Sequence, residues 1–298
     1  MTIGATPRLQ CPDTASAYAT QCAGSPTTWT LMRDRHDHQL WQVRGPRTTV
    51  AVKVASGENA ARALVREAAA LRAMPPGGVR VLHTADGVYC PAPWAWLITA
   101  WADGPTTWDT FKKLRDDTNA GRDEARRAAV ELCMSVGRLH AVGWVHGDLR
   151  PHHAVHTTAG VRLLSCTAAS RIGNAISASY LGGLVYLLSP QLAAALESTT
   201  VGVVLDSDDE VYTLAAGLWW AATTTWPLAY ADAGIDPSTM TSLALRRAIA
   251  TIKIPLAKAA GHPWPQFLAP LSAAMTQPPG SRPSALQLAD QLKAVPLI

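Results

Sequence analysis

The stretch WVHGDLRPHHAVH, residues 144–156, contains an aspartate, Asp148, in a short loop-like run that Pro151 closes. A hydrophobic stretch with helical spacing precedes this run, and an apolar run typical of a β-strand follows it. A carboxylate held in such a loop is a candidate general base, and the nearby histidines are candidate metal ligands. The stretch is therefore a catalytic loop, a metal site, or a catalytic loop that has lost its activity.

The metal alternative depends on four histidines of this stretch, which are His146, His152, His153 and His156. In an extended segment successive side chains point to opposite faces, so this spacing does not direct the four rings to one ion. No cysteine lies beside them in the sequence to supply a thiolate ligand. We therefore expect no metal site here, and we expect His152 and His153 to form a polar wall of the loop.

The composition is that of a folded protein with a large core. The chain has 298 residues, of which 48% are hydrophobic, and this is enough for one or two domains. Its net charge of +4 arises from 26 basic and 22 acidic residues scattered along the chain, so we expect no nucleic-acid partner. Five irregularly spaced cysteines favour a reducing, cytoplasmic setting, and we expect no secretory signal.

One uncharged run, residues 211–231, is long enough to cross a membrane. Three consecutive threonines and Pro227 weaken that interpretation, and acidic residues crowd just before the run. A helix that is apolar on all sides is also typical of the centre of a helical lobe. We therefore expect a buried helix and no membrane partner, with Trp219, Trp220 and Trp226 in the core.

Two parts of the chain differ in pattern. Before about residue 100, short β-branched and aromatic runs alternate with turn residues, and one alanine-rich helix is predicted at residues 59–74. After residue 105 the pattern is mostly helical. We therefore predict an α+β fold with an N-terminal extension at 1–27, a small β-rich lobe with one helix at 28–102 and a larger α-helical lobe at 103–298.

The order of several motifs resembles that of a protein kinase domain from about residue 28 to the end of the chain. In VAVKV, Lys53 stands where that family's lysine holds the phosphates of ATP, and in LVREAAAL, Glu67 stands where the helix glutamate pairs with it. In RLHAVGWVHGDLRPHH, His146 and Asp148 match the catalytic loop, which implies a packed, hydrogen-bonded histidine and a candidate base. The hinge between the lobes would comprise Thr99, Ala100 and Trp101.

Three later segments keep the same order. GGLVYLLSPQ resembles the end of an activation segment, with Ser189, Pro190 and Gln191 at the A-P-E position. DEVYTLAAGLWW resembles the central helix of the large lobe, and GSRPSALQLADQL resembles the closing R-P-S segment. The resemblance implies a two-lobed, protein kinase-like fold.

The departures from the family pattern concern the groups that hold phosphate and magnesium. The turn RDRHDH, residues 33–38, has no glycine where the family has G-x-G-x-x-G. His153 occupies the place of the asparagine that binds a second magnesium ion, and Ser165, Cys166 and Thr167 occupy the D-F-G places. A serine hydroxyl is a neutral, weak ligand for a hard dication. We therefore expect no ordinary magnesium site, while ATP binding stays open.

Two features keep alternatives open. Lys53 and Glu67 could pair only to fasten the predicted helix to the sheet, without holding a nucleotide. Three tryptophans fall near the hinge, where an adenine would lie in a working kinase, and these are Trp94, Trp96 and Trp101. Trp101 could stack on a base or fill the space where it would lie.

These departures favour a pseudokinase that binds a partner protein or peptide, as a scaffold or regulatory subunit, without ordinary Mg-ATP phosphoryl transfer. The alternative is an atypical phosphotransferase that acts on serine or threonine of a protein or biosynthetic peptide, with Asp148 as base. A small-molecule phosphotransferase is a third candidate, because antibiotic kinases also use an H-G-D loop, although they keep a magnesium aspartate on the next strand. The sequence pattern does not define the oligomeric state.

Overall fold

The computed structural model describes residues 11–35, 37–74, 83–89, 94–176, 180, 182–199, 201–259 and 262–297. Among them, residues 11–74 and 83–102 form one compact unit and residues 103–297 form a second. The first unit is built on an antiparallel sheet, and the second is mostly helical. The predicted α+β class is confirmed.

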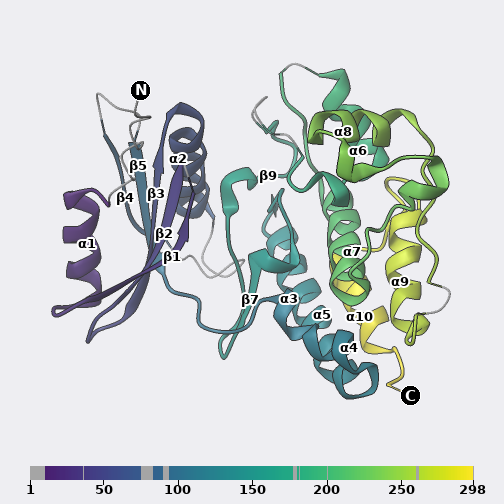
Figure 1. Ribbon diagram of the computed structural model, residues 1–298, viewed down its shortest axis with the longest axis horizontal. Helices are drawn as coiled ribbons and strands as arrows, with labels where there is room; N and C mark the ends of the chain where they lie inside the picture. The colour runs from purple at the N-terminus through teal and green to yellow at the C-terminus, as the bar shows by residue number, and fades with distance from the viewer. Residues whose placement is uncertain are drawn as a thin grey trace, which may run out of the picture. The chain divides into compact units, whose positions relative to one another are not determined.

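The first unit is built on a five-stranded antiparallel sheet with the strand order β1, β2, β3, β5, β4 (Figure 1). The strands are β1 Thr28–Asp34, β2 His38–Arg44, β3 Thr49–Ser56, β4 His83–Tyr89 and β5 Trp94–Ala100. Helix α2, Glu58–Ala73, packs against β3, β4 and β5. Because side chains alternate along a strand, Lys53 of β3 faces the α2 side, whereas its neighbours Val52 and Val54 face the other side.

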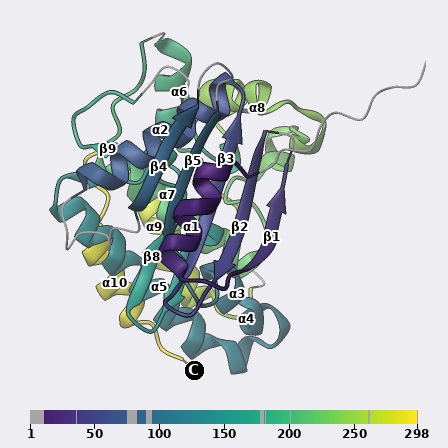
Figure 2. The same cartoon turned by 90° about the vertical axis from the view of Figure 1, so that its left-hand side faces the viewer.

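Helix α1, Asp13–Ala23, lies along the other face of the sheet (Figure 2). Its contact stripe consists of Ala15, Ala19 and Ala23, which are one turn apart and fully buried. They pack in one cluster with Val43, Val50, Val52, Val54, Trp96 and Ile98. This segment lies within the predicted N-terminal extension, residues 1–27, but the helix is part of the core of the first unit. Its stripe is made of small alanines, so it carries little of the apolar periodicity that identifies a core helix.

The second unit surrounds the loop at 146–150 with helices and two small antiparallel pairs. Strand β6, Trp144–Val145, pairs with β9, Ser170–Arg171, and β7, Ala154–Thr157, pairs with β8, Gly160–Leu163. The helices are α3 Thr107–Thr110, α4 Lys112–Asp116, α5 Thr118–Ala141, α6 Pro190–Ser198, α7 Ser207–Thr223, α8 Ser242–Thr251, α9 Pro265–Thr276 and α10 Ala285–Lys293. Short 3₁₀ turns are η1 Pro151–His153, η2 Cys166–Ala168, η3 Val185–Leu187, η4 Tyr230–Ala233 and η5 Pro237–Thr239.

Helix α7 contains most of the uncharged run, and it is buried within the second unit. Leu214, Leu218 and Trp219 are at most 2% exposed, so the predicted buried helix is confirmed. Trp220 and Trp226 differ from the prediction because they are only partly buried, and their rings stack on each other with centroids 4.9 Å apart. Within the part of the chain that the structure describes, we find no helix with both the length and the apolar character needed to span a membrane.

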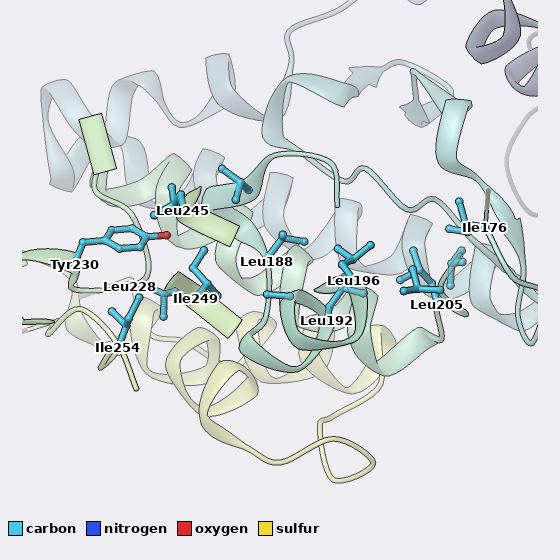
Figure 3. Packing of buried hydrophobic residues seen from close by; sticks show 14 residues of the cluster. Ile176, Leu188, Leu192, Leu196, Leu205, Leu228, Tyr230, Leu245, Ile249 and Ile254 are labelled. Atoms are coloured by element: carbon cyan, nitrogen blue, oxygen red, sulfur yellow. The ribbon is translucent and has the colours of Figure 1, made fainter. Parts of the chain in front are cut away.

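A hydrophobic cluster fixes the segment that leads into α6 (Figure 3). Leu188 and Leu192 pack there with Leu245 and Ile249 of α8. Ser189 caps α6, since its side chain accepts a hydrogen bond from the backbone N–H of Leu192 at 3.0 Å. The chain just before α6 is therefore held in place, and this matters because it contacts the loop that contains Asp148.

Candidate functional site

Lys53 and Glu67 form an ion pair within the first unit, as the sequence predicts. Lys53 Nζ lies 2.5 Å from Glu67 Oε1, and the Glu67 side chain is only 4% exposed. The pair joins the central strand β3 to helix α2. An ammonium group has three donors, so this geometry is compatible with a structural role and also with an additional phosphate contact.

The residues that the resemblance assigns to a hinge lie at and just after the end of β5. Thr99 is buried on the same sheet face as Lys53, because it pairs with Ala51 two residues earlier on β3. Ala100 is exposed, and Trp101 is partly buried with its backbone N–H donating to Thr49 O at 3.0 Å.

The other two tryptophans near the hinge lie on the opposite face. Trp94 and Trp96 pack in the cluster beneath α1, and the Trp96 ring contacts Tyr18 with centroids 5.5 Å apart. The alternation along β5 directs Trp94 and Trp96 away from Lys53, so they cannot fill a space beside Lys53. Stacking on a base, which was expected of Trp101, stays a prediction.

The carboxylate of Asp148 is held by an arginine two residues away. Arg150 Nε donates to Asp148 Oδ1 at 2.7 Å, and Arg150 Nη2 donates to Oδ2 at 2.9 Å. The Asp148 side chain is 14% exposed. Gly183 lies directly against it, because a Cβ atom at that glycine would come within 2.4 Å of Oδ1. Such a two-pronged pair balances the charge of the candidate base and donates one hydrogen bond to each of its oxygens.

The backbone of the same loop is fixed by a buried carboxylate from α7. Glu210 Oε1 accepts hydrogen bonds from the backbone N–H groups of His146, at 2.7 Å, and Gly147, at 2.8 Å. Glu210 Oε2 accepts from His140 Nε2 at 2.8 Å, and Glu210 is 4% exposed. Tyr180 adds a further contact, since its hydroxyl donates to Gly147 O at 2.6 Å. The loop is thus preorganised by groups that are distant in sequence.

His146 is the packed, hydrogen-bonded histidine that the resemblance implies. It is fully buried, and its Nε2 donates to Leu164 O at 2.8 Å, which leaves Nδ1 to accept from Asp148 N–H at 3.3 Å. His152 is not only a polar wall, because its ring stacks on Trp108 with centroids 5.0 Å apart.

His153 was expected to form a polar wall of the loop, and its ring contacts Asp148. Its Nδ1 donates to the backbone oxygen of Asp148 at 2.9 Å and lies 3.6 Å from the Asp148 carboxylate. Burial lowers the pKa of His153 to about 4, and the attraction of Asp148 opposes only part of this effect. The ring is therefore neutral at physiological pH and helps to fix the loop.

Ser165, Cys166 and Thr167 form the turn that follows β8. Ser165 has φ 62° and ψ 51°, a left-handed conformation that is uncommon for serine. Cys166 is buried, whereas Thr167 is partly exposed. The turn offers hydroxyl and thiol groups but no carboxylate. In the described ranges, no group of three or more His, Cys, Asp or Glu side chains is placed to hold a metal ion.

Arg282 connects three of the segments that carry the resemblance. Its Nη1 donates to Asp208 Oδ2 at 2.8 Å, at the start of α7, and its Nη2 donates to Gln191 Oε1 at 3.1 Å, in α6.

Neither a scan of protein-family models nor a search of curated proteins finds a match to the chain. The inference about function therefore rests on the motifs and contacts described above.

Three residues that shape the site were not singled out from the sequence, namely Arg150, Gly183 and Glu210. Arg150 had a local signal, because it is the nearest cation to Asp148 in the chain. Glu210 was counted only among the acidic residues before the uncharged run, although a carboxylate at the edge of a buried helix needs a partner. Gly183 had no signal, since its role depends on a contact with a residue 35 positions earlier.

Proposed function

We propose that the chain has a protein kinase-like fold and acts as a pseudokinase, which binds a partner protein or peptide without ordinary Mg-ATP phosphoryl transfer. The observation that carries the proposal is the two-pronged pairing of Asp148 with Arg150 beneath Gly183. A cation that donates to both oxygens competes with a substrate hydroxyl for the carboxylate. The absence of a carboxylate from residues 165–167 supports the same proposal.

The kinase-like part of the proposal is supported by contacts that join the motifs. Lys53 contacts Glu67, the loop histidine His146 is buried and hydrogen-bonded, and Arg282 contacts Gln191. The resemblance implies the first two of these contacts, and the third joins two of the segments that carry the resemblance.

An atypical phosphotransferase is the second candidate, with Asp148 as base and a Ser or Thr hydroxyl of a protein or peptide as acceptor. The Lys53–Glu67 contact favours it, because Lys53 stays 24% exposed on a sheet face that it shares with Thr99. An ammonium in that setting can hold phosphate. Nucleotide binding and turnover separate the two candidates.

The melting temperature is expected to rise by less than about 1 °C when ATP and magnesium are added together. A ligand present at about a hundred times its Kd stabilises the native state by about 2.7 kcal/mol, which in a chain of this size is a shift of several degrees. Differential scanning fluorimetry with ATP alone, magnesium alone and both measures the effect. A rise of several degrees in melting temperature that needs both ATP and magnesium would support the phosphotransferase. A similar rise with ATP alone would indicate a pseudokinase that binds nucleotide. Ser165→Asp is the matched comparison, because aspartate tolerates the left-handed conformation and supplies an oxygen ligand.

Phosphoryl transfer by the wild-type chain is expected to equal that of Asp148→Asn. The substitution keeps size and removes the carboxylate, but it also removes one acceptor of the Arg150 pair, so circular dichroism and melting temperature verify that the variant is folded. The measurement is transfer from radiolabelled ATP to the chain itself and to a mixed Ser/Thr peptide substrate. A wild-type rate about a hundredfold or more above that of Asp148→Asn would contradict the pseudokinase proposal, because this is the usual effect of removing a general base.

A further inference from the structure

A continuous row of four partly buried aromatic side chains runs through the second unit. The ring centroids of Trp108 and Trp220 lie 4.7 Å apart, and Trp226 stacks on Trp220 at 4.9 Å. Tyr186 stacks on Trp226 at 4.0 Å. The four side chains come from α3, the end of α7, the loop after α7 and η3, so the fold and not a run in the sequence brings them together. We call them the aromatic row.

The aromatic row is connected to the loop that contains Asp148. His152, which lies four residues after Asp148, stacks on Trp108 with centroids 5.0 Å apart. Tyr186 lies three residues after Gly183, which contacts the Asp148 carboxylate. The row and the loop therefore belong to one part of the second unit.

The nitrogen atoms of the row are hydrogen-bond donors without a partner. Within the part of the chain that the structure describes, the indole N–H groups of Trp108, Trp220 and Trp226 make no hydrogen bond, and they are not among the buried polar atoms that lack one. They therefore reach solvent. An indole nitrogen can donate but cannot accept, so the row suits a ligand that offers a series of acceptors.

The stacking decides which part of each ring a ligand meets. Trp220 and Tyr186 both stack on Trp226, so the edge of Trp226 with its N–H group is the part left to a ligand. Ring edges carry the positive part of the aromatic quadrupole and attract carbonyl oxygens. A nucleic-acid base needs an open ring face on which to stack, so the row does not suit one.

A proline-rich chain has the matching chemistry. Proline accepts through its carbonyl oxygen and has no N–H to donate. In the polyproline II conformation the carbonyls are not used in internal hydrogen bonds, and at a rise of about 3.1 Å per residue roughly four residues span the row. Aromatic surfaces recognise such chains because the conformation is already ordered before binding.

A shallow hollow of about 410 Å³ continues from the row and shares Trp226 with it. Among the described residues that line the hollow, Asp236 alone is charged. The Ser238 hydroxyl donates to Asp236 Oδ1 at 2.7 Å and the Ser238 N–H at 3.0 Å, and these hydrogen bonds lower the pKa of Asp236. One long basic side chain can place its apolar stem in the hollow and its charge at this carboxylate.

We propose that the aromatic row binds a proline-rich segment of the partner, with one basic side chain of that segment in the hollow beside Asp236. The tryptophan N–H groups donate to carbonyl oxygens of the segment, and the Asp236 carboxylate pairs with the basic group. This inference rests on the proposed function, because it names the class of peptide that the chain binds.

Fluorescence anisotropy with two labelled peptides tests the recognition of proline. In the first peptide one arginine precedes a run of eight prolines, and in the second the same arginine precedes a run of glycine and serine. The wild-type chain is expected to bind the proline peptide with a Kd at least about tenfold lower than that of the second peptide. Equal Kd values, or no binding of either peptide, overturn the proposal.

Two matched substitutions test the row itself. Trp226→Phe keeps an aromatic ring but removes the N–H, so the Kd of the proline peptide is expected to rise about threefold or more, the scale of one lost hydrogen bond. Trp29→Phe is the control, since Trp29 is also partly buried but belongs to the first unit, and it should leave this Kd unchanged. Circular dichroism and melting temperature verify that both variants are folded. The same Kd for both variants overturns the role of the row.

Asp236→Asn tests the hollow. It is expected to raise the Kd of the arginine–proline peptide about fivefold and to leave unchanged the Kd of a peptide with glutamine in place of arginine, because only the charged pair is lost. Asp290→Asn, at an exposed carboxylate of α10, should change neither Kd. An equal effect of Asp236→Asn on both peptides overturns the placement of the basic side chain.

The peptide titrations contain no ATP, so they are independent of the phosphoryl-transfer measurement. A wild-type chain that transfers phosphate contradicts the pseudokinase proposal and leaves a difference between the two peptides standing. A chain that transfers no phosphate and binds both peptides equally overturns only the inference about proline.

Discussion

Replacing Glu210 with alanine is expected to lower the free energy of unfolding by about 3–5 kcal/mol, because it breaks a buried hydrogen-bond network in which one carboxylate accepts from three donors. Glu210 is 4% exposed and accepts from the backbone N–H groups of His146 and Gly147 and from His140 Nε2. Alanine would leave these donors without their acceptor in a region closed to water. Each unsatisfied buried donor costs about 1–3 kcal/mol.

Urea denaturation followed by tryptophan fluorescence measures this effect, and two variants act as controls. Glu210→Gln keeps an oxygen that can accept from both backbone N–H groups, so its loss should be smaller, about 1–2 kcal/mol. Glu124→Ala removes a carboxylate of α5 that pairs with the exposed Lys113 at 2.9 Å, and it should change stability by less than about 1 kcal/mol. If Glu210→Ala lowers the free energy of unfolding by no more than Glu124→Ala does, Glu210 does not stabilise the loop.

Arg282→Met is expected to destabilise the chain by about 3–5 kcal/mol, because it removes the cation of a buried pair while keeping most of the apolar stem. The Arg282 side chain is fully buried in its pair with Asp208, and its guanidinium also lies over the Tyr212 ring at 5.1 Å. Methionine leaves Asp208 and Gln191 without this donor. The same denaturation experiment reports the effect.

Arg282→Lys and Arg247→Met sharpen the test of the Arg282 contact. Lysine keeps the charge, but its donors sit on one nitrogen and cannot reproduce the planar fork that places Nη1 against Asp208 and Nη2 against Gln191, so we expect an intermediate loss of about 1–3 kcal/mol. Arg247 pairs with Glu197 at 3.0 Å but is 64% exposed, and its replacement by methionine should change stability by less than about 1 kcal/mol. Equal effects of Arg282→Met and Arg247→Met would show that the connection between α6, α7 and the closing segment contributes little.

The sequence predicted the local patterns of this protein better than its distant contacts. The α+β class, the buried helix at the uncharged run and the meeting of Lys53 with Glu67 could be predicted, because hydrophobic periodicity and motif order carry that information. Helix α1 could not, because its contact stripe consists of alanines. Strand alternation could have placed Trp96 on the face opposite Lys53, had the register with β3 been known.

The candidate site shows the same division between local and distant information. Asp148 and His146 were identified from the loop itself, and the burial of His146 agrees with its expected place. The contacts that define the state of the loop come from Glu210 and Gly183, which are 62 and 35 residues after Asp148 in the chain. Such pairings depend on how helices and turns pack, and a single sequence does not display them.

The alanine stripe of α1 has a practical consequence for handling this protein. A shortened chain that begins at β1 would lose the helix and present Val50, Val52, Val54 and Ile98 to water as one continuous apolar sheet face. Exposed faces of this kind drive aggregation. Recombinant versions of the first unit should therefore start ahead of Asp13, even though the sequence pattern places that segment in an N-terminal extension.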